Sequence, residues 1–351
     1  MSENIVLSAW IMWGLAGVIT AVFILPFLVK KIERDLEIFL FVMGLSAVTI
    51  SQLWSKHLIC EALVEPIKIS VAVLVAGLLF RYVRDHIRLT IGKVIRQIGV
   101  KWVFFLIVVS LGIMSSAVTA IIASLILVEL VTGMKYDKKT ETNFVIIACF
   151  SIGLGAALTP IGEPLSTIAI SKLKGPPFNA DFWFLVKLLG FYILPGILLL
   201  GVLSTFIKPK NSAKTTLTED KPESIKDIFT RSGKVYLFVM ALIFLGKGFK
   251  PIIDAYIVQM PAKGLYWLNI VSAVLDNATL TAAEITPKMD IMHIRAILMG
   301  LLISGGMLIP GNIPNIIAAG KLNIPSKAWA KLGIPLGLIL MLGYFVAVFW
   351  T

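Results

Sequence analysis

Long apolar runs separated by short polar stretches recur along the whole chain. Many approach about 20 residues, the length that a helix needs to cross the hydrocarbon core of a membrane. They are rich in helix formers, Gly and Pro, and they lack the alternating pattern of barrel strands. The pattern predicts membrane helices at 7–29, 36–54, 67–84, 143–173 (interrupted), 182–207, 234–258 (irregular), 292–321 (interrupted) and 327–350. The expected fold is an all-α polytopic membrane protein.

Two further apolar segments are too interrupted to be single spans. They are 102–133, with Ser115-Ser116 near its middle, and 264–289, with Asp276-Asn277 near its middle. Each first arm has about 12 residues, or about 18 Å of helix, which reaches only halfway across a bilayer. Non-helical backbone is tolerated at that depth where protein or a wet cavity covers it. Both segments are therefore expected to be re-entrant helical hairpins with polar tips at the midplane.

Composition and charge agree with a membrane protein. Apolar residues make up 58% of the 351 positions and charged residues 15%, and the mean hydropathy is +0.92. The net charge of +12 does not indicate nucleic-acid binding, because 22 of the 32 Lys and Arg residues lie in short loops or the linker on one side of the expected layout. The positive-inside rule makes that side cytoplasmic and places both termini outside. The basic amphipathic stretch 85–99 is expected to lie on the membrane surface.

The chain divides into two related parts. The expected divisions are an N-terminal helix and basic loop (1–35), a first half (36–207, with the extra span 67–84 and the surface helix 85–99), a cytoplasmic linker (208–232) and a second half (233–351). In both halves a hairpin is followed by an interrupted helix with two prolines at the same spacing. Three crossings separate the hairpins, so they enter from opposite sides. This order predicts an inverted repeat, with which secondary transporters build midplane sites.

The prolines and glycines at the interruptions predict broken helices. Proline lacks an amide donor and crowds the preceding turn, and glycine loosens the chain beside it. The predicted breaks centre on Pro160, Gly162 and Pro164 in the first half and on Pro310, Gly311 and Pro314 in the second. Free carbonyls and amides at such breaks would line a binding site.

Oxygen-bearing side chains gather at the predicted tips and breaks, and oxygen is the ligand that small hard cations prefer. The candidates are Ser115, Ser116, Thr119, Thr159 and Glu163 in the first half, and Asp276, Asn277, Thr279, Asn312 and Asn315 in the second. The hypothesis for Na⁺ places it at Asp276, Asn277, Ser115 and Ser116. Asp276 and Glu163 matter most, because an ionisable group at this depth is costly and favours its neutral form. Each could then exchange a proton for a metal ion.

These residues resemble the ion transporter superfamily, and within it the NhaD-type sodium/proton antiporters. Ser272-Ala273-Val274-Leu275-Asp276-Asn277 looks like that family's Ser-x-x-x-Asp-Asn motif, and Thr159-Pro160-Ile161-Gly162-Glu163 looks like its Ser/Thr-Pro-Ile-Gly-Asp break. The chain is also similar to a compact family of predicted cation transporters. One departure is that Ser115-Ser116 stands where NhaD-type proteins usually carry a second Asp-Asn. The resemblance implies a scaffold that dimerises, hence a homodimer.

The expected function is exchange of Na⁺, or Li⁺, for protons in the plasma membrane of a prokaryote. The alternative is a sodium-coupled symporter of a small organic or inorganic anion, since the same superfamily contains sodium–dicarboxylate symporters. A channel or a non-transporting scaffold is a third reading, which the inverted repeat disfavours. No nucleophile–base pair or metal-ligand cluster predicts an enzyme. No cofactor is expected beyond Na⁺ and H⁺ as transported or coupling ions, and the expected partners are the lipid bilayer and a small ion, without nucleic acid.

Overall fold

A computed structural model describes residues 8–29, 31–32, 35–134, 136–209, 225–252, 260–275 and 277–350. Fourteen α-helices and two 3₁₀ helices make up the regular structure of these residues, and no strand is among them. The helices are α1 Ala9–Leu28, α3 Leu36–Ile50, α4 Lys56–Ile98, α5 Val100–Val118, α6 Ala120–Met134, α7 Lys138–Ala156, α8 Pro164–Lys172, α9 Phe184–Thr205, α10 Ile225–Ile252, α11 Ala262–Leu268, η2 Asn269–Ala273, α12 Asn277–Glu284, α13 Ile291–Gly305, η3 Ile309–Gly311, α14 Ile313–Leu322 and α15 Ser326–Trp350.

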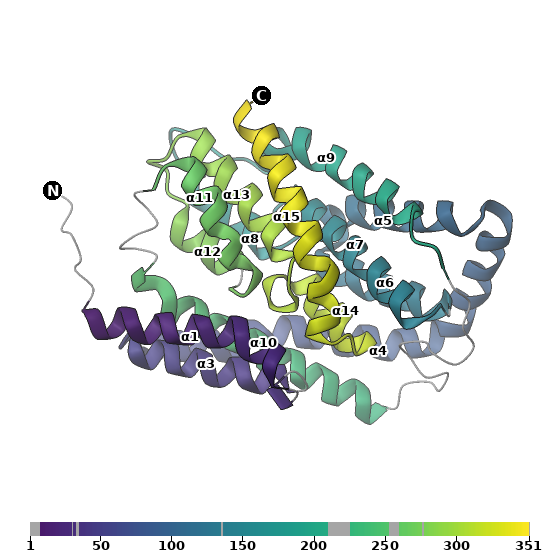
Figure 1. The fold of residues 1–351 in the computed structure, drawn as a ribbon, viewed down its shortest axis with the longest axis horizontal. Helices are drawn as coiled ribbons and strands as arrows, with labels where there is room; N and C mark the ends of the chain where they lie inside the picture. Colours follow the sequence, from purple (N-terminus) through teal and green to yellow (C-terminus); the bar gives the residue numbers. More distant parts are fainter. Residues whose placement is uncertain are drawn as a thin grey trace.

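The helices form two groups. Helices α1, α3, α4 and α10 run along the lower side in Figure 1, and the remaining helices lie above them. Within the lower group α10 packs on both α3 and α4, and α1 packs on α3. The upper group is joined to it mainly through α6, which contacts α4, and through α12 and α14, which contact α10. We call the lower group the side layer.

Five helices in the described part of the chain are long and apolar enough to cross a membrane, namely α1, α5, α9, α10 and α15. Large apolar side chains point outward on several of them, including Phe191, Phe206 and Trp350. Exposed apolar surface of this extent is unusual for a soluble protein, whereas lipid would cover it. The chain is therefore a multi-pass helical membrane protein, as the apolar runs predict.

Both interrupted helices are present. Helix α7 ends at Ala156 and α8 begins at Pro164, so that 157–163 is not helical. Helix α13 ends at Gly305 and α14 begins at Ile313, with only the short η3 between them. The predicted interruptions of 143–173 and 292–321 are confirmed at these positions.

Two predicted elements merge into one helix. The expected span 67–84 and the expected surface helix 85–99 are both parts of α4, a single helix of 43 residues. After Pro66 no proline occurs before Ile98, so every later turn keeps its backbone donor and the helix continues. The expected boundary near residue 85 is wrong.

The first hairpin breaks later than expected. Ser115 and Ser116 are helical, and their hydroxyl oxygens lie 2.7 Å from carbonyl oxygens one turn earlier, Gly112 O and Ile113 O. The helix ends only at Val118, and Thr119 adopts φ +78° and ψ 149°. Helix α5 thus has 19 residues, against about 12 expected for a half-crossing arm.

Helix α10 begins at Ile225, inside the predicted linker 208–232. Residues 225–232 are therefore helical, and residues 210–224 lie outside the described part of the chain. The predicted irregular helix 234–258 is described up to Ile252, and residues 253–259 lie outside the described part.

Candidate functional site

The first candidate centre is the break between α7 and α8. Pro164 occupies the first turn of α8, where a missing amide donor costs nothing. Gly162 lies so close to the end of α7 that a Cβ on it would stand 2.0 Å from Ala156 O. Only glycine, which has no Cβ, allows the backbone at position 162 to lie this close to Ala156 O. Glu163 precedes α8 in an extended conformation and is 7% exposed, so the sequence places a carboxylate inside the protein at the break.

Side chains of α8 return to the carbonyls that the break frees. Ser166 Oγ donates to Ala156 O at 3.3 Å, and Thr167 Oγ1 donates to Pro160 O at 2.6 Å. Carbonyls at the end of a helix have no partner within it. These hydroxyls therefore hold the two half-helices in one fixed geometry.

The turn between α5 and α6 crosses this break. The amide of Ala120 donates to Gly162 O at 2.8 Å, and Ser115 Oγ donates to Ile152 O at 2.9 Å. Thr159 Oγ1 donates to Ser116 O. Predicted site residues of the tip and of the break thus meet, although the Ser116 hydroxyl is bound within its own helix and does not reach the break.

The second candidate centre is the break between α13 and α14. Asn315 is fully buried, and its Nδ2 donates to Gly305 O at 2.8 Å and to Leu308 O at 2.9 Å. Its Oδ1 is buried and has no hydrogen-bond partner among the described residues. An amide oxygen of this kind is a ready ligand for a hard cation.

The stretch between η2 and α12 crosses the second break. Ser272 Oγ donates to Leu301 O at 3.3 Å and contacts the Asn277 amide. The orientation of that amide which satisfies its neighbours directs the nitrogen to Gly311 O at 3.1 Å. Asp276 lies outside the described residues, so its side chain is not placed. Thr279 lies against α10, where a Cβ on Gly246 would stand 2.1 Å from Thr279 Cγ2.

The two centres share one pattern of contacts. In each centre a serine hydroxyl donates to a carbonyl of the first half-helix, Ser115 to Ile152 O and Ser272 to Leu301 O. A side chain of the second half-helix donates to the last carbonyl of the first, Ser166 to Ala156 O and Asn315 to Gly305 O. An N–H near the crossing turn donates to a glycine carbonyl of the break, from the Ala120 backbone to Gly162 O and from the Asn277 side chain to Gly311 O. Along the chain, these contacts align Ser115 with Ser272 and Thr119 with Asp276. This alignment differs by four residues from the predicted one, which pairs Ser115-Ser116 with Asp276-Asn277.

The two broken helices also touch each other. A Cβ on Gly153 of α7 would stand 2.5 Å from Asn312 Nδ2, and Asn312 is 5% exposed. One turn earlier Cys149 Sγ donates to Pro314 O at 3.7 Å. The middle of α7 is thus a wall of the second centre.

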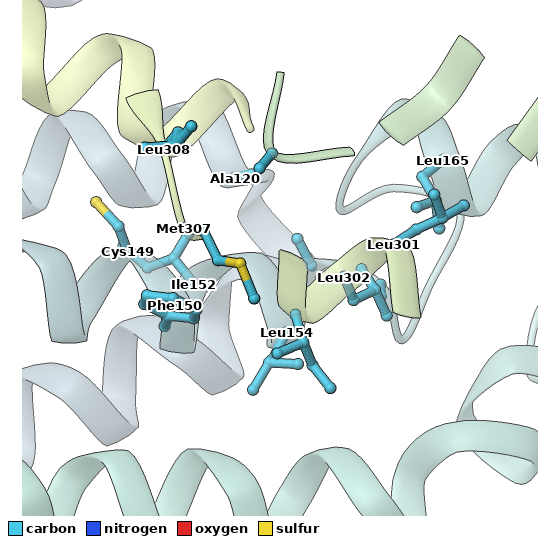
Figure 2. Close-up of a cluster of buried hydrophobic side chains, with 14 of the residues drawn as sticks. Ala120, Cys149, Phe150, Ile152, Leu154, Leu165, Leu301, Leu302, Met307 and Leu308 are labelled. Carbon is cyan, nitrogen blue, oxygen red and sulfur yellow. The ribbon is translucent and has the colours of Figure 1, made fainter. Parts of the chain in front are cut away.

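Apolar side chains surround the two breaks. Figure 2 shows this cluster, whose labelled members are Ala120, Cys149, Phe150, Ile152, Leu154, Leu165, Leu301, Leu302, Met307 and Leu308. They come from α6, α7, α8, α13 and the second break. Polar groups enclosed in this way must be paired or bind a ligand, because water cannot satisfy them.

A cavity of about 600 Å³ reaches the second centre. Its lining includes Ile309 of η3, Ile316 of α14 and, from the side layer, Glu37 and Lys234. These last two form an ion pair of 2.7 Å. The cavity therefore lies between the side layer and the apolar residues that flank the second break.

Sequence reasoning missed several buried polar residues. Ser304 Oγ donates to Asn269 O at 2.6 Å, and Asn269 Nδ2 donates to Glu284 Oε2 at 3.0 Å. Lys321 of α14 forms a buried ion pair with Glu129 of α6. Glu129 and Glu284 are acids within apolar segments, and this signal alone could have identified them.

The fold and the two centres define an all-helical, multi-pass membrane protein with two polar breaks enclosed in its interior. The sequence matches the family described as "Protein of unknown function (DUF1646)" over residues 13–351, and the chain belongs to that family. No curated protein matches the chain.

Proposed function

We propose that this protein is a secondary active transporter that exchanges a monovalent cation, Na⁺ or Li⁺, for protons by alternating access. The observation that carries the proposal is the matched pair of centres, in which residues of a polar turn contact corresponding carbonyls of a broken helix in each half. Broken helices at the interface of an inverted repeat are a recurrent way to build a transport site. The proposal includes that repeat, with 102–133 and 264–289 as its re-entrant hairpins.

Oxygen atoms at the second centre favour a cation as the substrate. Asn315 Oδ1 is buried without a hydrogen-bond partner among the described residues, and Asp276 follows Ser272 in the motif that resembles NhaD-type antiporters. The carboxylate of Glu163 stands at the first break. In the proposed cycle Asp276 and Asn277 bind the cation with Asn315, and protonation of an acid releases it.

The cavity supports access from the cytoplasm. Its lining includes Asp227 and Lys321, which belong to the segments 208–234 and 321–331 expected to be cytoplasmic, and Leu36, which follows the expected cytoplasmic loop 30–34. In this proposal the side layer is the stationary scaffold of a homodimer in a prokaryotic plasma membrane, and both termini face outward.

One observation favours the second candidate, a sodium-coupled symporter of a small anion. Helices α8 and α14 both begin at a break, and neither has a side-chain hydrogen bond at its N-cap. The free amides and the dipole at these ends attract negative charge. The transport experiment must therefore distinguish a cation from an anion.

The test is transport by purified protein in proteoliposomes that contain a pH-sensitive dye. We expect external Na⁺ or Li⁺, supplied without a transportable anion, to make the interior more alkaline, because protons leave as the cation enters. Asp276→Asn and Glu163→Gln should each abolish the response. Glu65→Gln is the matched control, because that carboxylate is exposed on α4 and pairs with the exposed Lys68.

No pH change with any alkali cation, together with Na⁺-dependent uptake of a labelled dicarboxylate, would establish the symporter instead. Full exchange by Asp276→Asn or by Glu163→Gln would remove that residue from the mechanism.

A further inference from the structure

Glu284 is a buried carboxylate that the two centres do not use directly. It is the last residue of α12 and is 1% exposed. Its Oε2 accepts a hydrogen bond from Asn269 Nδ2 at 3.0 Å, whereas its Oε1 is buried and has no hydrogen-bond partner among the residues that the structure describes. An ionised carboxylate with an unsatisfied oxygen is costly in the protein interior, and a proton removes that cost.

No ion pair offsets the charge of Glu284 within the described part of the chain. Helix α12 packs on α8, α13 and α10. Lys172 of α8 donates to the backbone carbonyl of Ile285 at 3.2 Å, and Arg295 of α13 lies 5.3 Å from the centre of the Tyr192 ring. Among the residues of α10 whose side chains the structure describes, the basic ones are Lys234, which pairs with Glu37, and Lys226, Lys247 and Lys250; the acid is Asp227. None of these is within 4.0 Å of the Glu284 carboxylate.

Hydrogen bonds lead from Glu284 to the second centre. Asn269, which binds Glu284 through its side chain, accepts from Ser304 Oγ through its backbone carbonyl at 2.6 Å. The next residue, Gly305, is the one whose carbonyl accepts from Asn315 at 2.8 Å. A change in the charge of Glu284 therefore acts on the residues that shape the second break.

The first half has no such acid at this place. Counted from Ala120 and Asn277, which make the matched contacts, Leu127 in α6 stands where Glu284 stands in α12, and Leu127 is fully buried. A leucine therefore fills the corresponding buried position in the first half. The carboxylate thus adds chemistry to the second half that the fold does not require.

We propose that Glu284 is a proton-binding residue of the exchanger, distinct from the acid that binds the cation. When the cation leaves the second centre, the Glu284 carboxylate takes up one proton and becomes a neutral acid; when the cation binds, that proton is released to solvent. This inference rests on the proposed exchange function, and it assigns the coupling proton to a separate residue beside the site.

The alternative is that Glu284 only holds Asn269 in place. Glutamine can accept the same hydrogen bond from Asn269 through its amide oxygen, but it cannot bind or release a proton. Glu284→Gln therefore separates the two roles.

The experiment measures protons released when Na⁺ binds to the purified protein in weakly buffered detergent solution, between about pH 6 and pH 9. We expect wild type to release protons on binding, and its apparent Kd for Na⁺ to fall up to about tenfold per pH unit where the competing proton titrates. Glu284→Gln should bind Na⁺ at high pH within about threefold of wild type, release one proton fewer per Na⁺, and lose this part of the pH dependence. Glu284→Asp should restore proton release.

Each outcome decides between the assignments. Wild-type protein that binds neither Na⁺ nor Li⁺ overturns the exchange function itself. Unchanged proton release in Glu284→Gln overturns only the role of Glu284, and loss of Na⁺ binding in a folded Glu284→Gln makes it a cation ligand instead. If Glu284→Gln does not fold, Asn269→Ala is decisive: loss of a donor to the carboxylate should move the midpoint of proton release to higher pH, and an unmoved midpoint overturns the assignment.

Discussion

At the two breaks, single side chains replace the hydrogen bonds that the helices lose. Ser166 and Asn315 stand at the same position of α8 and α14 and donate to the last carbonyl of the preceding half-helix. The prolines and glycines predict that the helices break here, because they act on their own backbone. The partners of Ser166 and Asn315 could not be predicted, because they depend on how the half-helices fold back in three dimensions.

Gly153 is the residue through which the two broken helices touch. Gly153→Ala should place a methyl group 2.5 Å from Asn312 Nδ2, which we expect to destabilise the protein by about 1–3 kcal/mol and to reduce cation transport by displacing Asn312. The measurements are thermal unfolding in detergent and the proteoliposome assay.

Gly320→Ala is the matched control for this variant. Gly320 also lies within a helix, but a Cβ on it would meet nothing within 4 Å. Its replacement should be neutral or slightly stabilising. Equal behaviour of the two alanine variants would mean that the contact with Asn312 is unimportant.

At the scale of elements, the turn between α5 and α6 depends on one strained residue. Thr119 has φ +78°, a value that is unfavourable for a β-branched side chain, and its Oγ1 accepts from the amide of Ile122 at 3.3 Å to cap α6. Thr119→Gly should relieve the strain and raise the free energy of unfolding by about 1 kcal/mol, because glycine loses little as a cap.

Thr119→Ala is the comparison for Thr119→Gly, since alanine loses the cap and keeps the strain. It should unfold at a lower temperature than wild type. If Thr119 is also a cation ligand, both variants should transport more slowly than wild type. Thr119→Gly would then be more stable but slower, whereas Thr119→Ala would be both less stable and slower.

Helix α13 begins with a charged cap outside the apolar segment. Asp290 Oδ1 accepts from the His293 amide at 2.8 Å, and this hydrogen bond lowers the pKa of Asp290 below its usual value of 3.8. A lowered pKa in the folded state means that the charged cap stabilises the protein above the unfolded-state value, and that this stability is lost as the pH falls through the lower folded-state pKa.

We therefore expect wild type to lose stability relative to Asp290→Asn as the pH is lowered below about 4. Asparagine keeps the cap without a titrating group. The measurement is the unfolding temperature of both proteins at neutral and at acidic pH, and an identical acid shift in both would show that the charge of Asp290 adds nothing.

The elements themselves followed from local rules more closely than the turns between them. Apolar runs and proline pairs place α7, α8, α13 and α14 correctly. The expected break at Ser115 is wrong, because a serine can stay within an apolar helix when a carbonyl of its own preceding turn lies within hydrogen-bond distance of its hydroxyl. In α4, by contrast, a helix end was expected where none occurs. A change from apolar to amphipathic surface does not by itself end a helix.

At the scale of the whole molecule, a buried ion pair joins the two halves. Lys321 of α14 binds Glu129 of α6, and the two side chains are only 10% and 6% exposed. Lys321→Met should leave the carboxylate of Glu129 without this partner and destabilise the protein by about 3–5 kcal/mol. Thermal unfolding in detergent is the measurement, and the charge-reversed pair Lys321→Glu with Glu129→Lys should recover part of the loss.

The exposed pair of Lys187 and Asp181 is the control for the buried pair. It is 3.2 Å long, with side chains 70% and 55% exposed, so Lys187→Met should cost at most about 1 kcal/mol. Similar effects of Lys187→Met and Lys321→Met would show that burial does not strengthen the link between the halves.

The contact between Gly153 and Asn312 also has a consequence for biogenesis. The ribosome delivers α7 to the membrane long before the residues of the second break emerge. The contacts of Cys149 with Pro314 and of Gly153 with Asn312 can form only once those later residues have been synthesised. The packing of α7 seen in the complete protein therefore depends on both halves of the chain.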